Sequence, residues 1–353
     1  MVRPFSLLLA SLLVTLPLVS CSSSSDSPAG TNNEAKAKGR LQQVLNQNKL
    51  RCGISGELPG FSVLDDQGTY SGLDVDVCRA IAAALFDDPT KVEYVPLNAK
   101  ERFTAVQAGD VDILSRNTTW TVDRDSTNQL AFAPVVFYDS QGMMVKKDSG
   151  ITSLKELQNR TICTQTGTTT EKNLADQMSK LKVTYKPVVY EDINAAYAAY
   201  AEGRCDAITS DRSQLASRRV KLANPDSNVI LEDVMSKEPL APAVADGDAQ
   251  WADVVRWVVN ATIEAEELNI NQKNLATFTT SQDPVVQRFL GQKDALGKGL
   301  GLSDDFASRI VKHVGNYGEI YDRHLGPQTK LNLPRGQNQL WSKGGLLYSP
   351  PFR

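Results

Sequence analysis

Histidine is scarce in this chain, which has only His313 and His324 among its 353 residues. No group of His, Cys, Asp and Glu residues has the spacing of a zinc site. The segment Gly53-Ile-Ser-Gly also lacks the five-residue pattern of a nucleophile elbow. We therefore expect no metal, no cofactor and no catalytic residue.

An excess of charge of one sign is also lacking. The 38 basic and 41 acidic residues leave a net charge of −3, and aromatic residues make up only 7% of the chain. A nucleic-acid surface needs clustered positive charge, usually with aromatic side chains on which bases stack. We therefore expect no nucleic-acid partner.

An apolar run from Phe5 to Val19, preceded by Arg3, marks the N-terminus. It is too short to span a membrane in the mature protein, which indicates a signal peptide and an exported chain. The run ends in Leu18-Val-Ser-Cys21, which resembles the lipobox of bacterial lipoproteins, where the cysteine carries the lipid. The alternative is a plain secretory signal with an incidental cysteine. We assign residues 1–21 to a lipoprotein-type signal peptide and residues 22–44 to a flexible tether, and expect a periplasmic or other extracytoplasmic location with a lipid anchor at Cys21.

Four cysteines remain besides the one in the lipobox. An even number of cysteines outside the cytoplasm allows two disulfides, with three possible connectivities. We favour Cys52–Cys78 and Cys163–Cys205, because each pair falls within one predicted lobe. Four buried free thiols are the alternative.

Strands and helices alternate from Leu50 onward, which predicts an α/β fold. Lobe 1 is predicted from residues 45–137 and 243–353, and lobe 2 from residues 138–242. The chain then crosses between the lobes twice, near Val136–Met143 and near Lys237–Pro242. The main expected elements are strands at 50–54, 92–95, 161–165 and 183–189, and helices at 73–86, at 251–267 and in a short segment opened by a capping box from Ser153 to Glu156.

Two segments share one helix–glycine–strand pattern, which we call the device. Residues 101–115 and 195–210 each read as an amphipathic helix, a glycine stop and a short apolar strand. The first copy leads to Arg124 and the second ends at Asp211. Ligands of open α/β sheets bind at the carboxyl ends of strands. One cation and one anion at two such ends suit a small zwitterion.

Four ordered motifs carry a resemblance to a known family. They are Gly68-Thr-Tyr-Ser-Gly-Leu-Asp-Val-Asp-Val-Cys78, Ser115-Arg-Asn-Thr-Thr-Trp-Thr-Val-Asp-Arg124, Gly167-Thr-Thr-Thr-Glu171 and Thr209-Ser-Asp-Arg-Ser213. Over about residues 45–353 the chain resembles the polar amino-acid family of bacterial solute-binding proteins, in its general L-amino-acid-binding branch. The resemblance implies a two-lobed, hinged periplasmic-binding fold of type II that encloses its ligand, and an ABC transporter permease as partner. We expect a monomer.

The resemblance also implies roles for single residues. Arg124 matches the arginine that binds the α-carboxylate, to which a planar guanidinium can donate two hydrogen bonds. Thr119 matches a hydroxyl on the same carboxylate, Asn117 a position at the amino-group end, and Asp211 the carboxylate that takes the α-ammonium. Thr169 stands where a helix begins, and free N–H groups there suit an anion; N-capping by this threonine is compatible with that role.

The residues that select the ligand's side chain are harder to read. Glu57 and Phe61 lie in the first strand-to-helix loop, where this family places residues against the ligand. Arg116 and Trp120 either line the cleft or face outward.

Two residues near the second crossing leave a similar choice open. Lys237 and Glu238 either reach the pocket or pair with each other. Taken together, the motifs predict the binding protein of an ABC-type importer, which delivers an L-amino acid to the permease. Two alternatives remain: a dehydratase-like or cell-wall lytic enzyme on the same scaffold, and an amino-acid-sensing ectodomain, which would need a fused membrane span and output domain.

Overall fold

A computed structural model describes the protein over residues 39–353. The predicted signal peptide, the lipidation site Cys21 and most of the predicted tether lie outside this range. The tether prediction is wrong for residues 40–44, because helix α1 (Arg40–Gln47) begins there and buries Leu41 and Val44 in the core. No helix within residues 39–353 is long and apolar enough to cross a membrane.

Lobe 1 is built on a five-stranded sheet in the order β5-β1-β6-β14-β7. Strand β1 runs parallel to both of its neighbours, β5 and β6, and β14 runs antiparallel to β6 and β7. A small antiparallel sheet, β2-β3-β4, lies between β1 and helix α2 in the chain. The strands are β1 (Leu50–Ile54), β2 (Glu57–Leu58), β3 (Ser62–Leu64), β4 (Tyr70–Ser71), β5 (Val92–Pro96), β6 (Ile113–Leu114), β7 (Leu130–Phe132) and β14 (Ala243–Ala245).

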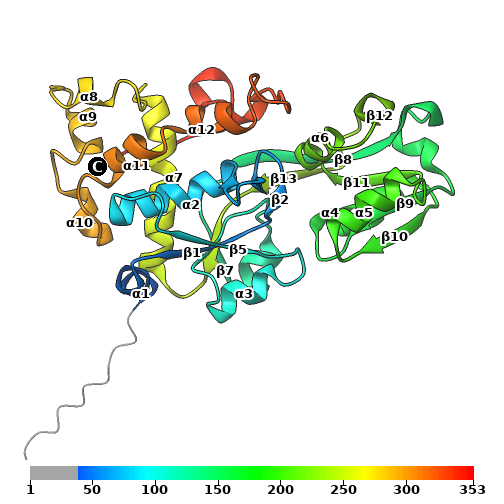
Figure 1. Cartoon of the computed structure of the whole chain (residues 1–353), viewed down its shortest axis with the longest axis horizontal. Helices are drawn as coiled ribbons and strands as arrows, with labels where there is room; N and C mark the ends of the chain where they lie inside the picture. Colours follow the sequence, from blue (N-terminus) through cyan, green and yellow to red (C-terminus); the bar gives the residue numbers. More distant parts are fainter. Residues whose placement is uncertain (1–38) are drawn as a thin grey trace, which may run out of the picture. The chain divides into compact units, whose positions relative to one another are not determined.

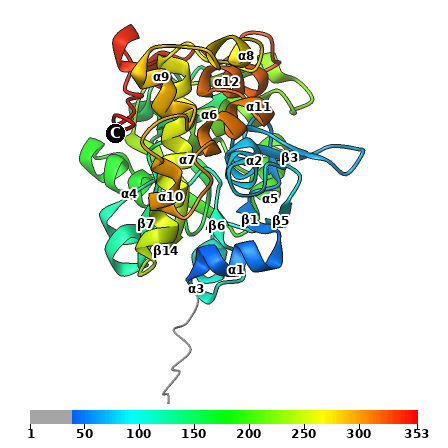
Figure 2. The same ribbon diagram turned by 90° about the vertical axis from the view of Figure 1, so that its left-hand side faces the viewer.

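Helices surround this sheet. The long helices α2 and α7 are largely buried and join strands of the sheet in one large apolar core. Figures 1 and 2 show α8, α9, α11 and α12 gathered at the end of lobe 1 opposite α1 and α3. The helices are α2 (Leu73–Phe86), α3 (Arg102–Ala108), α7 (Ala249–Glu267), α8 (Leu275–Phe278), α9 (Pro284–Phe289), α10 (Leu296–Leu300), α11 (Phe306–His313) and α12 (Tyr317–His324).

Lobe 2, green in Figure 1, has a sheet in the order β10-β9-β11-β8-β12, with β13 also paired to β8. Strand β9 runs parallel to β10 and β11, whereas β8 is antiparallel to its neighbours. The elements are β8 (Phe137–Lys146), β9 (Thr161–Gln165), α4 (Thr169–Leu181), β10 (Lys186–Tyr190), α5 (Ile193–Ala201), β11 (Ala207–Asp211), α6 (Arg212–Arg219), β12 (Asn228–Ile230) and β13 (Ser236–Leu240).

Two antiparallel strands connect the lobes. The long strand β8 leaves lobe 1 at Phe137, and β13 returns beside it, with Ser236 opposite Gln141 and Leu240 opposite Phe137. Figure 1 shows β8 and β13 running side by side between the lobes. Two adjacent crossing strands are the arrangement that the sequence led us to expect, and such a pair can serve as a hinge.

Helix α12 and the segment after it contact the first crossing. The Asn338 side chain pairs with both backbone groups of Tyr138, at 2.6 Å to its N and 3.2 Å to its O. The Tyr317 hydroxyl donates to the carbonyl of Val136 at 2.7 Å. Nothing in the Gly- and Pro-rich segment after α12 predicted that Asn338 would hold a hinge strand.

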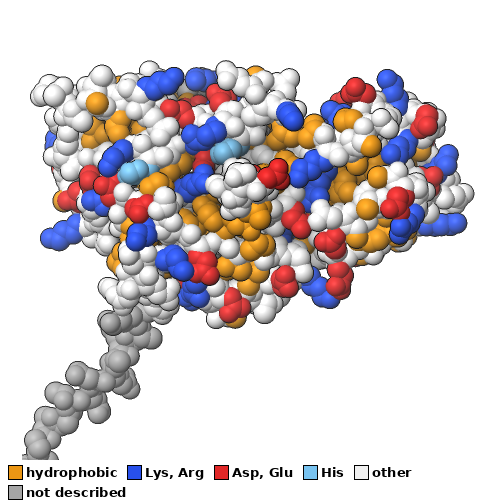
Figure 3. Space-filling model, in the orientation of Figure 1, with side chains coloured by type: hydrophobic (Ala, Val, Ile, Leu, Met, Phe, Trp, Pro, Cys, Tyr) orange, Lys and Arg blue, Asp and Glu red, His pale blue; other side chains and the backbone are white. Residues whose placement is uncertain are grey.

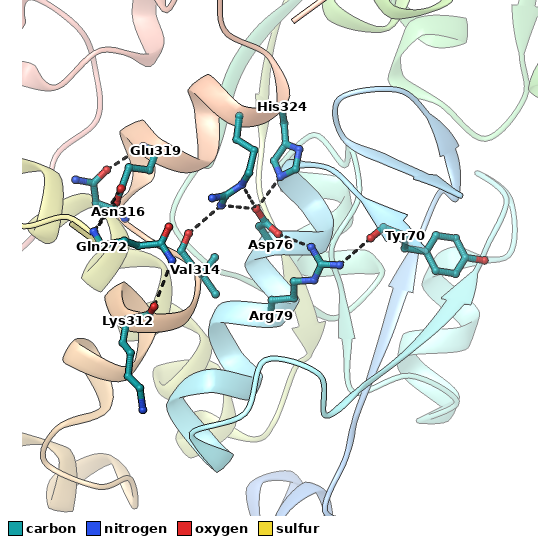
Figure 4. Close-up of polar contacts among 10 residues, drawn as sticks. Tyr70, Asp76, Arg79, Gln272, Lys312, Val314, Asn316, Glu319 and His324 are labelled. Atoms are coloured by element: carbon teal, nitrogen blue, oxygen red, sulfur yellow. Dashed lines mark hydrogen bonds and ion pairs between the residues drawn. The ribbon is translucent and has the colours of Figure 1, made fainter. Parts of the chain in front are cut away.

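Both histidines bind carboxylates in lobe 1. Asp76 on α2 is 2% exposed and accepts bonds from His324, Arg323 and Arg79 at 2.6, 2.7 and 3.0 Å. Burial opposes ionisation of Asp76, yet the bonds from His324 and Arg323 lower its pKa. Figure 4 shows this cluster between α2 and the last helix. His313 contacts Asp87 at 2.6 Å in the same way, so both histidines attach the late helices to the lobe.

Both predicted disulfides are confirmed. Cys52 on β1 is joined to Cys78 on α2, and Cys163 on β9 is joined to Cys205 just before β11. Each bond therefore ties a strand of one lobe to a neighbouring part of the same lobe. Loops of 26 and 42 residues closed in this way stabilise a fold by about 3–4 kcal/mol each.

The predicted capping box at Ser153 is wrong. The Ser153 side chain accepts no capping bond, and only a short 3-10 helix (Leu154–Leu157) follows it. Glu156 instead accepts the backbone N–H of Thr152 at 2.6 Å. The glutamate thus reaches one residue further back than the capping box requires.

Candidate functional site

A polar cavity lies between the two lobes. It holds about 350 Å³ of space free of protein atoms, open solvent at its mouth included. Residues of both lobes line the cavity, and Ala99 is the single apolar residue among them. The lining residues are Ala99, Arg102, Arg116, Asn117, Thr119 and Arg124 from lobe 1, and Gln165, Thr168, Thr169, Thr170, Ser210, Asp211 and Gln214 from lobe 2.

The two predicted devices end at this cavity. Helix α3, its αL stop at Gly109 and strand β6 form the first, and α5, Gly203 and β11 form the second. Arg124 follows β6 on a single π-helical turn (Asp123–Thr127), and Asp211 is the last residue of β11. The structure thus brings a cation and an anion from different lobes to one cavity.

Arg124 is buried and poorly neutralised. Its side chain donates to the carbonyl of Thr119 at 2.8 Å and lies over the ring of Phe103, 5.1 Å from the centroid. Among residues 39–353 no carboxylate forms an ion pair with it. Burial lowers the pKa of Arg124, while the charges of Glu238 and Asp211 oppose that shift. A buried guanidinium without an ion-pair partner is suited to bind an anion.

Asp211 is a buried carboxylate that lacks a positively charged partner among the described residues. It is 5% exposed, and its carboxylate accepts from the Asn117 amide of lobe 1 at 3.1 Å. Burial raises the pKa of Asp211 well above its usual value, and the nearby charges of Asp139 and Glu238 raise it further. Within the described part of the chain no cation lies within ion-pair distance of it. A ligand ammonium would supply that missing charge.

Two threonines of the Gly167 motif, Thr168 and Thr169, occupy different positions at the start of α4. Thr168 is the N-cap of α4 and accepts the N–H of Glu171 at 3.2 Å, so N-capping belongs to Thr168 and not to Thr169. Thr169 is the first residue of the helix, where N–H groups have no intrahelical acceptor. Its hydroxyl lies 3.4 Å from that of Thr119 in the other lobe.

Glu238 is closer to the site than the sequence could establish. It is 1% exposed on β13 and accepts bonds from Thr119, Thr169, Asn173 and Ser236. Its neighbour on the strand, Lys237, is exposed. Because successive residues of a strand point to opposite faces, the two side chains diverge.

Arg116 and Trp120 differ in their relation to the cavity. Arg116 is 7% exposed and lines the cavity, whereas Trp120 is 42% exposed and donates its indole N–H to Asp125. Burial lowers the pKa of Arg116 to about 10, although the charge of Asp74 opposes the shift. Arg102, which sequence reasoning missed, also lines the cavity at 3% exposure. Its position in the first helical turn of the device was the available signal.

Glu57 and Phe61 lie away from the cavity lining. Phe61 is 1% exposed in the core of lobe 1, where it packs edge-on against Phe137 at 5.2 Å. Glu57 is exposed on β2 and faces Arg218 of lobe 2 at 3.8 Å. Phe61 lies in the turn between β2 and β3, where its backbone N–H donates to the carbonyl of Leu58 at 3.1 Å.

Polar contacts close the lobes around the cavity. Lys100 pairs with Glu191 at 2.7 Å and Lys172 with Asp123 at 3.3 Å, each across the two lobes. Ser217 donates to the carbonyl of Pro59 at 2.8 Å. The two ion pairs are exposed, and exposed ion pairs contribute little free energy each. Figure 3 shows acidic and basic side chains scattered over both lobes on the face in view.

The sequence matches one known protein family over most of its length. The sequence profile of the bacterial extracellular solute-binding proteins, family 3, matches residues 50–275. The chain belongs to this family. Members of this family are binding proteins. The two-lobed α/β architecture of this chain agrees with its membership.

Individual relatives are similar over nearly the whole chain. The general L-amino acid-binding periplasmic protein AapJ of Rhizobium johnstonii is 48% identical over 92% of this chain and 93% of its own length. The glutamate/glutamine/aspartate/asparagine-binding protein BztA of Rhodobacter capsulatus is 47% identical over 90% and 95%. A solved periplasmic binding protein from Brucella ovis, with glutathione bound, is 49% identical, superimposes with a TM-score of 0.88 and covers 89% of this chain and 99% of its own.

Proposed function

We propose that this solute-binding protein captures an L-amino acid between its lobes and delivers it to the permease of an ABC-type importer. One observation carries the proposal: Arg124 of lobe 1 and Asp211 of lobe 2, buried and of opposite charge, line the same cavity. A free amino acid carries one carboxylate and one ammonium. It can therefore satisfy both side chains at once.

Each charged group of the ligand has a proposed partner. Arg124 binds the α-carboxylate, assisted by the free N–H groups at the start of α4 beside Thr169. Asp211 binds the α-ammonium, which replaces the amide of Asn117 as its hydrogen-bond donor. Thr119 lies beside this pair of charges, and Glu57 lies at the contact between the lobes.

The cavity favours a ligand with a polar side chain. Twelve of its thirteen lining residues are polar, and three of them are arginines. This agrees with the names of the relatives, which bind general L-amino acids, or glutamate, glutamine, aspartate and asparagine. The Brucella protein holds glutathione, a peptide that also ends in an amino-acid zwitterion.

The family and the leader sequence support a proposal for the location of the protein. We propose that the mature protein is a monomer outside the cytoplasm, anchored to a bacterial membrane by lipid on Cys21. The lipobox-like sequence supports the anchor, and the periplasmic relatives support the location.

Calorimetric titration of purified, ligand-free protein with each of the twenty L-amino acids tests the function. Each charge-assisted hydrogen bond contributes about 1.5–3 kcal/mol. Four or five of them therefore supply the roughly 8 kcal/mol that micromolar binding requires, after ordering costs. We expect at least one L-amino acid to bind at micromolar concentration or below, and its D-enantiomer to bind more weakly.

The same titration separates the proposal from its enzymatic alternative. An enzyme would consume the ligand, so the recovered amino acid would be chemically changed. Recovery of an altered product, or heat from none of the twenty, would contradict the proposed function.

A further inference from the structure

The Glu238 carboxylate is buried at the hinge yet has only neutral hydrogen-bond partners. Its Oε2 accepts from the hydroxyls of Thr119 and Thr169, the latter at 2.9 Å. Its Oε1 accepts from the Asn173 amide at 2.8 Å and from the Ser236 hydroxyl at 2.5 Å. These donors come from lobe 1, from lobe 2 and from β13 itself. No ion pair to Glu238 forms within residues 39–353.

Such a carboxylate fixes the direction of its neighbours' protons. An ionised carboxylate only accepts hydrogen bonds, and a hydroxyl has a single proton to donate. When Thr119 and Thr169 both donate to Glu238, neither retains a proton for the cavity that they line. Each hydroxyl then offers only lone pairs to a ligand.

The two hydroxyl oxygens are 3.4 Å apart, and Asp211 lines the same cavity. An ammonium group has three N–H donors. Thr119, Thr169 and Asp211 present three acceptors, one for each of these donors. Without a fixed proton direction, the hydroxyls could instead present protons to the ammonium and repel it.

We propose that Glu238 is a positioning residue that sets Thr119 and Thr169 as acceptors for the ligand's ammonium. This inference rests on the proposed function, and it assigns the Thr119 hydroxyl to the ammonium end of the ligand instead of the carboxylate end. Because one donor comes from each lobe, Glu238 completes this acceptor pair only when the lobes are closed. Recognition of the amino group is thereby tied to closure.

The test is a mutational cycle measured by calorimetry with the tightest-binding amino acid of the twenty. Glu238→Met removes both acceptor oxygens, and Glu238→Gln removes the charge but keeps the shape. Each is made in the natural protein and in a Thr119→Val/Thr169→Val background. Glu264→Gln, which changes a buried glutamate of α7 outside the cavity lining, is the matched control. Circular dichroism and thermal unfolding confirm that each variant is folded.

In the natural background we expect Glu238→Met to weaken binding roughly 10- to 100-fold, as for the loss of one or two oriented hydrogen bonds. Glu238→Gln should have an intermediate effect, and Glu264→Gln should have none. In the double-valine background, the Glu238 substitutions should change affinity less than about threefold, because the hydroxyls they act through are gone.

Two outcomes would overturn the inference. Equal losses in both backgrounds would show that Glu238 acts through general stability, and unchanged affinity in folded Glu238→Met protein would show that it has no role in binding. Failure of the natural protein to bind any amino acid would instead reject the proposed function, so the two failures are distinguishable.

Discussion

Replacing Arg124 with alanine is expected to weaken every amino-acid ligand by about 2–5 kcal/mol, or at least roughly 30-fold. The ligand carboxylate would be enclosed in the cavity without its charged partner, and an unpaired buried charge is costly. Arg124→Lys should recover only part of the loss, because an ammonium lacks the planar fork that binds a carboxylate through two bonds. Calorimetric titration measures both variants.

Arg256→Ala is the matched control for the loss of an arginine. Arg256 lies on α7 with 44% of its side chain exposed and pairs with Asp253 one turn away, so its removal should leave ligand affinity unchanged. A second comparison uses the ligand's carboxamide, which lacks the negative charge. If the natural protein bound an amino acid and its carboxamide equally well, the role of Arg124 would be wrong.

Asp211→Asn is expected to cost a similar 2–5 kcal/mol, because the ligand ammonium would lose its only ionised partner in the cavity lining. Asp226→Asn, at an exposed position of lobe 2, is the control and should bind normally. Titration of the two variants with the same ligand provides the measurement.

The natural protein should also bind more weakly at low pH. Burial raises the pKa of Asp211 in the ligand-free protein, whereas an ammonium partner favours the ionised carboxylate and lowers that pKa in the complex. Binding therefore releases a proton, and affinity should fall by up to about tenfold per pH unit below the ligand-free pKa. Asp211→Asn should lose this slope. Asp139→Asn is the control, because burial also raises the pKa of Asp139, to about 6. This variant should keep the pH dependence of affinity. If Asp139→Asn alone lost the pH dependence, the effect would belong to Asp139.

Local sequence signals were sufficient where one residue pattern determined one element. Strand β1, strand β9 and helix α2 have the predicted bounds, because apolar runs of the right length end at clear glycine, proline or aspartate signals. Both disulfides followed from the placement of cysteines within each lobe. Helices α8 to α10 are short and weakly patterned, and the sequence did not reveal them.

The sequence predicted the site residues that belong to a recognisable motif. It predicted less well those whose position depends on tertiary packing. Arg124 and Asp211 end the two repeated devices, so their meeting at one cavity followed from topology. Phe61 was predicted to lie against the ligand, but it occupies the turn between β2 and β3 and its side chain packs into the core of lobe 1. Glu238 is the opposite case: its role depends on hydroxyls about 70 and 120 residues away, which no local pattern encodes.

The central claim is that a ligand bridges Arg124 and Asp211 and so closes the lobes about β8 and β13. A ligand that contacts both lobes must favour the closed state by its differential affinity for it. Small-angle X-ray scattering of ligand-free protein, before and after addition of the tightest-binding L-amino acid, measures this directly. We predict that the radius of gyration falls in the natural protein and stays constant in the Arg124→Ala/Asp211→Ala variant. Tight binding by the natural protein with no change in its dimensions from an open ligand-free state would place the site within one lobe and contradict the account.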